Sequence, residues 1–215
     1  MIRNEKEILS LMRENKGILS AEELDKLGIS IKKLQQMARD KKVERLVRGL
    51  YLHPEFVEDP YYITQYRASK AIFSHETALY LHSLSDENPV KIVATIPSGY
   101  NSSLLKDKGH KFYYLKKDLW KMGQKEIKSP FGNKILVYSK ERSLAEMMAK
   151  VESGDRNLLV NALKAGLKAG ILNRLDLIKY AEIFGSKEQM RNYMEVLIWY
   201  LKILRIIQMR NLTIV

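Results

Sequence analysis

The sequence of 215 residues contains no cysteine. Disulfide bridges, zinc sites with thiolate ligands and a cysteine nucleophile are therefore excluded. Long hydrophobic runs are missing as well. The most apolar stretch, residues 196–207, is interrupted by Lys202 and Arg205 and is shorter than the roughly 20 apolar residues of a membrane span. The first residues lack the apolar core of a signal peptide, so we expect a cytoplasmic protein with no membrane partner.

Positive charge is abundant and unevenly distributed. The chain has 37 Lys and Arg against 25 Asp and Glu, a net charge of +12, which favours polyanionic partners. Residues 1–27 are nearly balanced, with five basic and six acidic residues, whereas residues 28–52 hold seven basic and two acidic ones. With 46% hydrophobic residues the chain can also bury a core, and its length allows two domains.

The first 42 residues predict three short helices. Asn4 and Ser20 each stand three residues before a glutamate, which is the capping-box pattern of a helix start. Gly17 would end the first helix and Gly28 the second, while Ser30 can cap the third. Leu24 and Leu27 lie on one face of the second helix. In the third helix Ile31, Leu34, Met37 and Ala38 are expected to point inward.

Residues 41–52 predict two short strands that turn at Arg48-Gly49. Gly49 can adopt a positive φ, and β-forming residues lie on either side of the turn. Leu50 and Leu52 would pack back on the helices. The alternation through Leu46 and Val47 is imperfect, so it does not assign both faces of the first strand. Three helices followed by a hairpin are the order of elements in a winged helix-turn-helix domain.

The outward face of the third helix is the candidate recognition surface. A helix in the major groove needs long side chains that bond to base edges, as arginine does to guanine and glutamine to adenine. In the hairpin, Arg45 and Arg48 would contact phosphate or the minor groove. The predicted DNA-binding residues are Lys32, Lys33, Gln35, Gln36, Arg39, Lys42, Arg45 and Arg48. The alternative is a solvated face on a small helical domain, as most charge runs are.

Two proline pairs, His53-Pro54 and Asp59-Pro60, mark a polar connection, because proline constrains the residue before it and lacks an amide donor. We place the domain boundary there, with the DNA-binding domain at residues 1–56 and a larger domain at residues 57–215. The larger domain predicts helices capped by Ser74 and by Ser143, the latter with Glu146 at the capping-box position. Further strands are expected at residues 91–96, 111–115 and 134–138, and further helices at 61–70, 157–169, 174–184 and 187–208. The fold class is α+β, a small sheet followed by a helical C-terminal half.

Two parts of the larger domain allow alternative interpretations. Residues 100–150 hold 12 basic against 5 acidic residues, with Phe112, Tyr113, Tyr114 and Trp120 interleaved. This pattern is typical of a second nucleic-acid surface, but buried aromatics beside solvated lysines are the favoured interpretation. For residues 196–207 we favour a central core helix over a segment that docks on a partner.

Most catalytic and metal-binding motifs are missing from the sequence. His75-Glu76 resembles the start of a zinc-protease helix, but Leu79 stands where the second metal-binding histidine is needed. The chain has no P-loop and no dinucleotide glycine fingerprint, so we expect no cofactor, no metal and no catalytic residue. The competing hypothesis is a nucleic-acid-modifying enzyme that uses His75, Glu76 or Asp86 in a cleft of the larger domain.

Three blocks of the sequence resemble the AbiEi-like antitoxins of bacterial type IV toxin–antitoxin systems, which act in abortive infection by phage. Residues 45–52 hold the family's arginine-glycine-aliphatic-tyrosine wing at Arg48 to Tyr51. Residues 74–84 resemble its second block, which is the most specific of the three, and residues 140–146 are similar to its helix start after the last strand. Residues 151–215 are only loosely similar to the family.

The resemblance implies a repressor and antitoxin. The winged domain would bind double-stranded operator DNA with inverted repeats and repress its own operon. The larger domain would counteract a nucleotidyltransferase toxin, without a stable complex between the two proteins. A DNA-binding transcriptional regulator unrelated to a toxin is the alternative.

Overall fold

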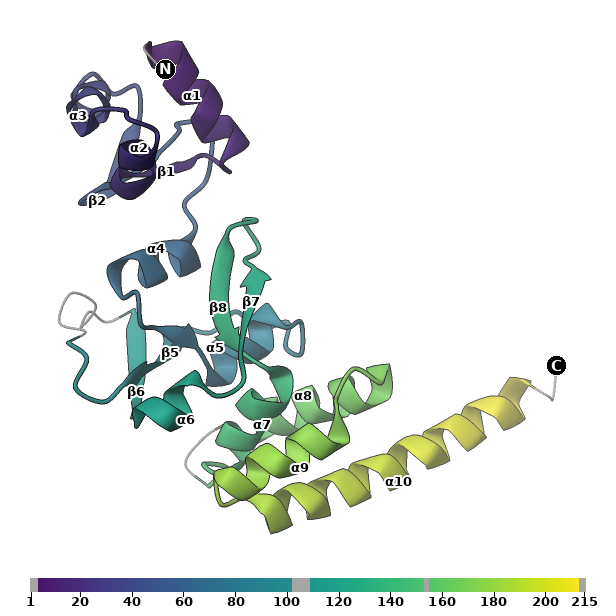
Figure 1. Ribbon diagram of the computed structural model, residues 1–215. Helices are drawn as coiled ribbons and strands as arrows, with labels where there is room; N and C mark the ends of the chain where they lie inside the picture. Colours follow the sequence, from purple (N-terminus) through teal and green to yellow (C-terminus); the bar gives the residue numbers. More distant parts are fainter. Residues whose placement is uncertain (1–3, 102–108, 153–154, 213–215) are drawn as a thin grey trace. The chain divides into compact units, whose positions relative to one another are not determined.

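A computed structural model describes residues 4–101, 109–152 and 155–212, with the backbone alone for 210–212 (Figure 1). The described chain is an α+β fold, as predicted, and divides into two compact units. The first, unit 1, comprises Met1–Ser69 and Ile127–Ile135, and unit 2 comprises Lys70–Glu126 and Leu136–Val215. Unit 1 thus extends past residue 56, the predicted end of the DNA-binding domain.

Unit 1 begins with short helices around a small sheet. Its elements are α1 (Glu5–Glu14), β1 (Ile18–Ser20), α2 (Ala21–Lys26), α3 (Ile31–Arg39), β2 (Glu44–Val47), β3 (Leu50–Leu52) and α4 (Pro60–Arg67). Both predicted capping boxes are confirmed, at Asn4 with Glu7 and at Ser20 with Glu23. Ser30 occupies the N-cap of α3, but its side chain makes no capping hydrogen bond.

The sheet of unit 1 has the antiparallel order β1-β3-β2. The hairpin of β2 and β3 was predicted, and Gly49 has a φ of +82° in its turn. The register shifts between Arg45 and Val47, a bulge that explains why the alternation there is imperfect. Strand β1 was not predicted, because its three residues are all buried and so show no alternation.

The core of unit 1 fixes which face of each helix points outward. Leu34 and Met37 of α3 are buried, as predicted, while Ile31 and Ala38 are half-buried. Leu27, on the same face of α2 as the buried Leu24, is 45% exposed. It lies beyond the last turn of α2, at the C-cap, where the helix no longer directs it inward. The buried cluster consists of Ile8, Met12, Leu19, Leu24, Ile29, Leu34, Met37, Val43 and Tyr51.

Asp59 joins α4 to a distant part of unit 1. It is fully buried, and its Oδ1 accepts hydrogen bonds from the backbone N–H groups of Tyr61 and Tyr62 at the start of α4. Its Oδ2 accepts from Ser129 Oγ at 2.5 Å and from Asn133 Nδ2 at 2.8 Å. These two residues lie in the segment 127–135, which explains why that segment belongs to unit 1.

Unit 2 combines a mixed sheet with a helical half. Its elements include β4 (Ile72–Phe73), α5 (His75–Leu81), β5 (Ile92–Pro97), β6 (His110–Leu115), α6 (Lys117–Lys121), α7 (Lys140–Met148), α8 (Arg156–Ala169), α9 (Arg174–Ile183) and α10 (Lys187–Leu212). Strands β7 (Gln124–Lys128) and β8 (Lys134–Tyr138) complete the sheet, whose order is β6-β5-β4-β8-β7. Residues 127–128 of β7 and 134–135 of β8 belong to unit 1. The three predicted strands are confirmed as β5, β6 and β8. The sequence did not reveal β4, which has two residues, or β7, which is mostly charged.

Helix α7 begins four residues earlier than predicted. Its N-cap is Ser139, whose side chain accepts a hydrogen bond from the backbone of Arg142, and not Ser143, which is buried inside the helix. Glu146 is not part of a capping box, because its carboxylate binds the guanidinium of Arg142. The ion pair of Glu146 with Arg142 therefore takes the place of the capping box that the sequence predicted for Ser143 and Glu146.

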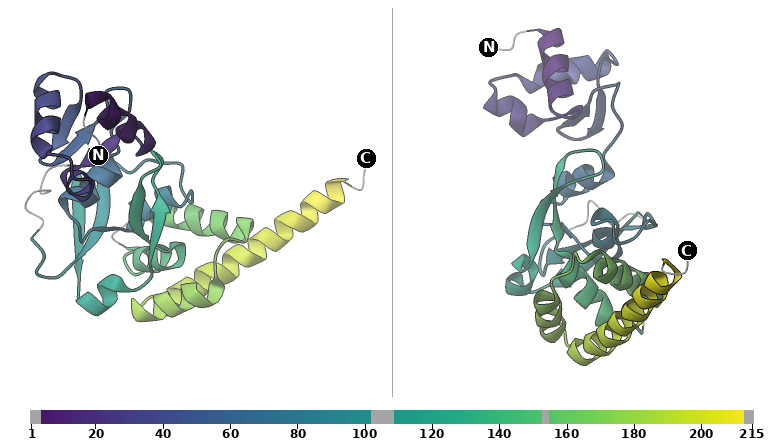
Figure 2. Two further views of the ribbon diagram at one scale, coloured as in Figure 1. Left: turned by 45° about the horizontal axis from the view of Figure 1, so that its top comes forward. Right: turned by 90° about the vertical axis from the view of Figure 1, so that its right-hand side faces the viewer.

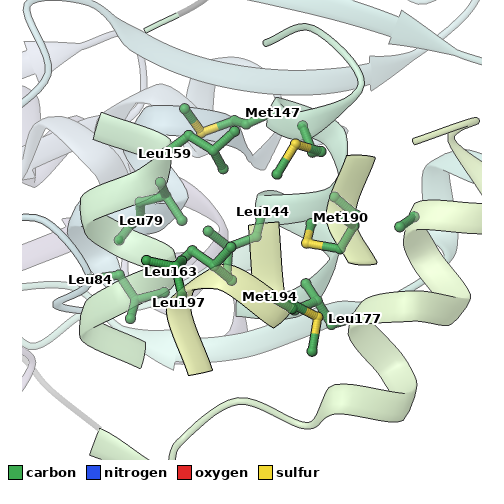
Figure 3. Packing of buried hydrophobic residues seen from close by; sticks show 14 residues of the cluster. Leu79, Leu84, Leu144, Met147, Leu159, Leu163, Leu177, Met190, Met194 and Leu197 are labelled. Atoms are coloured by element: carbon green, nitrogen blue, oxygen red, sulfur yellow. The ribbon is translucent and has the colours of Figure 1, made fainter. Parts of the chain in front are cut away.

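Helices α7 to α10 share one hydrophobic core, which Figure 3 shows from close by. Leu144 and Met147 of α7 meet Leu159 and Leu163 of α8 there, and Leu177, Met190, Met194 and Leu197 come from α9 and α10. Met147 also lines the cavity described below. The helical C-terminal half of the α+β fold is therefore as predicted.

The central core interpretation of residues 196–207 was wrong. Leu197 is buried, but Val196 and Trp199 are each 65% exposed, and Ile206 and Ile207 are exposed too. Helix α10 continues past the ends of α8 and α9 in Figure 1 and in the left view of Figure 2, so among the described residues no other helix covers its last turns. No helix of the described residues is long and apolar enough to cross a membrane.

Candidate nucleic-acid interface

Helix α3 presents the predicted recognition residues on its outer side. Because Leu34 and Met37 point into the core, Lys32, Gln36 and Arg39 are exposed. Lys33 and Gln35 are half-buried at the edges of this face. The α3 face, which we define as Lys32, Lys33, Gln35, Gln36 and Arg39, carries three positive charges and two amides.

Side chains at the end of the α3 face bond to one another. Gln36 Nε2 donates to Asp40 Oδ1 at 2.9 Å, and Arg39 Nη1 donates to Gln36 Oε1 at 3.5 Å. All three side chains are exposed, so these bonds exchange readily with water or a ligand. Contact with a base edge by Gln36 or Arg39 would replace them.

The hairpin turn carries Arg48 directly before Gly49. Both Arg45 on β2 and Arg48 in the turn are exposed. Tyr66 of α4 donates its hydroxyl hydrogen to the backbone oxygen of Gly49 at 2.9 Å, which anchors the turn. A Cβ added at Gly49 would lie 2.8 Å from that hydroxyl oxygen, so both the close contact and the positive φ favour glycine here.

Lys42 differs from the other predicted DNA-binding residues because it already has an acidic partner. Its Nζ lies 2.5 Å from Glu5 Oε2 of α1, and this hydrogen bond raises the pKa of Lys42. The pair is exposed, so phosphate could compete with the carboxylate. The eight predicted residues thus all belong to unit 1, with Gln36 and Arg39 in direct contact and Lys42 paired to α1.

Unit 2 contains a second candidate site, a cavity of about 360 Å³ next to β6. The lining residues are His75 and Glu76 of α5, Lys111 and Tyr113 of β6, and Met147, Lys150, Val151 and Asp155 from α7 and the chain beyond it. We call it the His75 cavity. Two of the three residues proposed for an enzyme, His75 and Glu76, are therefore brought together. The third, Asp86, is exposed and does not line the cavity.

His75 is held on several sides. Its imidazole stacks on the Tyr113 ring, with centroids 4.0 Å apart and an interplanar angle of 20°. Its Nδ1 lies 3.0 Å from Ser74 Oγ. The residue is 4% exposed, and burial, with a contribution from Lys150 and Lys111, lowers the pKa of His75 to about 3. The imidazole is therefore neutral at pH 7, which makes it a poor general acid.

Sequence reasoning missed three residues of the His75 cavity, Lys111, Tyr113 and Lys150. Lys111 and Tyr113 are two positions apart on a strand and therefore share a face, a signal that the sequence does contain. Within the described residues, no group of three or more His, Asp or Glu side chains could hold a metal ion. His82, seven residues after His75, does not line the cavity, and its Nε2 donates to the backbone oxygen of Tyr138 at 2.8 Å.

The buried imidazole of His75 is expected to make stability depend on pH. Unfolded His75 takes up a proton near pH 6.5, whereas the folded pKa is about 3, so the unfolded state binds more protons as the pH falls. Lowering the pH from 7 to 5 should therefore lower the free energy of unfolding by about 2 kcal/mol through His75. Urea denaturation of the wild type and of His75→Gln at both pH values measures it. Equal pH dependence in the two proteins would contradict the placement of His75.

Comparison with known proteins reveals a similarity of fold. No family model and no curated protein matches the sequence. The crystal structure of the Rv2827c protein from Mycobacterium tuberculosis is similar, with a TM-score of 0.55 and 12% sequence identity. The match covers 87% of this chain and 79% of that chain. At this identity the similarity supports a common architecture and does not extend to function.

Proposed function

We propose that unit 1 contains a winged helix-turn-helix that binds double-stranded operator DNA with inverted repeats. The observation that carries the proposal is the α3 face, where Lys32, Gln36 and Arg39 are exposed because Leu34 and Met37 between them fill the core. Arg45 and Arg48 in the neighbouring hairpin supply the phosphate or minor-groove contacts. In this role α3 enters the major groove and the β2–β3 turn forms the wing.

The proposal extends to an autorepressor and antitoxin of a type IV system, with no catalytic role. This part rests on the resemblance of residues 45–52, 74–84 and 140–146 to the AbiEi-like antitoxins. Unit 2 would then counteract a nucleotidyltransferase toxin without a stable complex. Coexpression with a toxin encoded beside the gene tests it, since full-length protein with both Arg39→Ala and Arg48→Ala should still restore growth. Failure of the wild type to restore growth would leave the plain DNA-binding regulator.

Arg39→Ala is expected to weaken operator binding by about 1 to 3 kcal/mol, because arginine bonded to guanine discriminates by that amount. The loss should be confined to the operator, with little change for unrelated DNA of the same length. Mobility-shift titrations on both DNAs measure the difference. Arg13→Ala is the matched control, since Arg13 is a half-exposed arginine of α1 that pairs with Glu55.

Arg48→Ala should instead weaken binding to all sequences alike, because a phosphate contact carries no sequence information. Its removal should also reduce the slope of log affinity against log salt by about 1. Titrations at several salt concentrations measure the slope. If binding is unaffected by both Arg39→Ala and Arg48→Ala, the proposed interface is wrong.

A further inference from the structure

The His75 cavity contains buried polar atoms that lack hydrogen-bond partners. Within the described part of the chain, His75 Nε2 and Glu76 Oε2 are each inaccessible to solvent and unpaired. Such atoms cost free energy unless a water, ion or ligand satisfies them. Both residues line the cavity, so a ligand bound there could provide the missing partners.

The hydrogen bonds of Ser74 bear on which nitrogen of His75 carries the proton. Thr95 Oγ1 donates to Ser74 Oγ at 3.0 Å, so Ser74 Oγ already accepts one bond. The proton of Ser74 Oγ can then be donated to His75 Nδ1, 3.0 Å away. We assign this direction to the bond, and with Nδ1 as the acceptor the proton of the neutral imidazole is on Nε2. In this tautomer the buried nitrogen of the cavity is a hydrogen-bond donor.

Two ammonium groups add positive charge beside this donor. Lys150 Nζ lies 3.4 Å and Lys111 Nζ 4.9 Å from the centroid of the Tyr113 ring, whose ring also stacks on His75. Both lysines are exposed at the outer side of the cavity, whereas His75 and Met147 are buried. Partial burial lowers the pKa of Lys150, and a bound anion would offset that burial cost. The arrangement of donors favours a compact anion.

Two acidic residues also line the cavity and restrict the ligand further. Asp155 is already engaged, since its Oδ1 accepts the backbone N–H of Leu158 at the start of α8. Glu76 keeps one buried oxygen unpaired, so it calls for a hydrogen-bond donor on the ligand. A second hollow of about 330 Å³ shares Glu76, Lys111 and Asp155 with the His75 cavity and gives room for the rest of a small molecule.

The backbone of His75 is left-handed at the start of α5. Its φ is +50°, a conformation that is uncommon outside glycine but that histidine, like asparagine and aspartate, adopts more often than most residues. Strained backbone persists where the surrounding structure holds it, and it clusters at ligand sites. Here the strain accompanies the placement of the imidazole against Tyr113.

We propose that the His75 cavity binds a small phosphate monoester that carries hydroxyl groups, such as a sugar phosphate. The phosphate accepts hydrogen bonds from His75 Nε2, Lys111 and Lys150, and a ligand hydroxyl donates to Glu76. A cavity near the lower end of the usual range of ligand sites suits a molecule of this size.

Calorimetric titration of the full-length protein with ribose 5-phosphate tests the proposal, with inorganic phosphate and ribose as the other arms. Ribose 5-phosphate should bind more tightly than inorganic phosphate, and ribose should not bind detectably. Equal affinity for the two phosphate compounds would reduce the site to a bare phosphate site and overturn the proposed ligand class. An absence of binding at millimolar concentrations of all three would overturn the site itself.

Exposed lysines allow a matched test without loss of the fold. Lys150→Ala should weaken binding of ribose 5-phosphate by about ten- to a hundredfold, because a hydrogen bond to a charged group is lost. Lys121→Ala is the control, since Lys121 is an exposed lysine of unit 2 that does not line the cavity. Equal weakening by the two substitutions would mean attraction to the basic protein as a whole.

Glu76→Gln distinguishes the contribution of the sugar hydroxyls to binding from that of the phosphate. The substitution removes a negative charge and the strong acceptor, so inorganic phosphate should bind at least as well as before while ribose 5-phosphate loses affinity. Loss of inorganic phosphate binding instead would refute the assigned role of Glu76. The Arg39→Ala variant should bind ribose 5-phosphate like the wild type, which keeps this test independent of DNA binding.

Discussion

Replacing Arg142 by alanine is expected to lower the free energy of unfolding by about 3 to 5 kcal/mol, as for other buried ion pairs that lose one partner. Arg142 is fully buried, and its Nη2 lies 2.9 Å from Glu146 Oε1. Its Nη1 donates to the backbone oxygen of Leu119 at 2.7 Å and to that of Met122. The guanidinium also lies 3.3 Å from the centroid of the Tyr138 ring. One side chain thus joins α7 to the segment around α6 and to β8.

The effect of Arg142→Ala should come mainly from the partner that is left behind. Burial already raises the pKa of Glu146, and without the guanidinium its carboxylate would be an unpaired buried charge. The double variant Arg142→Met, Glu146→Leu should therefore be more stable than Arg142→Ala.

Urea denaturation at pH 7 measures these differences. Arg191→Ala is the matched control, because Arg191 forms a pair with Glu188 at a half-exposed position of α10 and should change stability by less than about 1 kcal/mol. If Arg142→Ala costs as little as Arg191→Ala, the buried network does not stabilise unit 2.

Asp59→Ala is expected to lower the free energy of unfolding by about 3 kcal/mol. The substitution removes the N-cap of α4, which is worth about 0.5 to 2 kcal/mol, and hydrogen bonds from Ser129 and Asn133 to a buried carboxylate. Asp59→Asn should cost less, because its amide oxygen can still accept the backbone bonds of Tyr61 and Tyr62.

The same denaturation experiment tests the role of Asp59, with Asp155→Ala as the control. Asp155 caps α8 through one bond to Leu158 but is exposed, and within the described ranges its carboxylate accepts no such bond from a distant segment. A loss no larger than that of Asp155→Ala would show that Asp59 acts as an ordinary helix cap and that its bonds to Ser129 and Asn133 add little.

The sequence predicted correctly those elements that depend on contacts between residues close together in the chain. The capping boxes at Asn4 and Ser20 involve residues three positions apart, and the turn at Gly49 depends on its own φ, so neighbours in the sequence suffice. The α+β class followed from these elements and from the apolar periodicity of the later helices. Strand β4 could not be found in this way, because its two residues are strand only through pairing with β5 and β8.

Burial and long-range pairing decided the features that the sequence did not show. Ser139 and Ser143 are both plausible caps, and the burial of Arg142 with Glu146 selects the first. In the His75 cavity, His75 and Glu76 were recognised from the sequence. The parallel pairing of β5 with β6 places Lys111 beside the cavity, and the position of the end of α7 places Lys150 there. Neither the pairing nor the helix position can be read from the sequence.

The bonds of Asp59 to Ser129 and Asn133 also bear on the order in which the protein folds during synthesis. The cluster of α1, α2, α3 and the hairpin uses residues up to Tyr51, so it can form soon after that part of the chain leaves the ribosome. Asn133 lies 74 residues beyond Asp59 and is made much later. Until then the carboxylate of Asp59 has only the start of α4 to bind. Unit 1 is therefore completed in two stages, the second of which waits for the β7–β8 turn of the newly made chain.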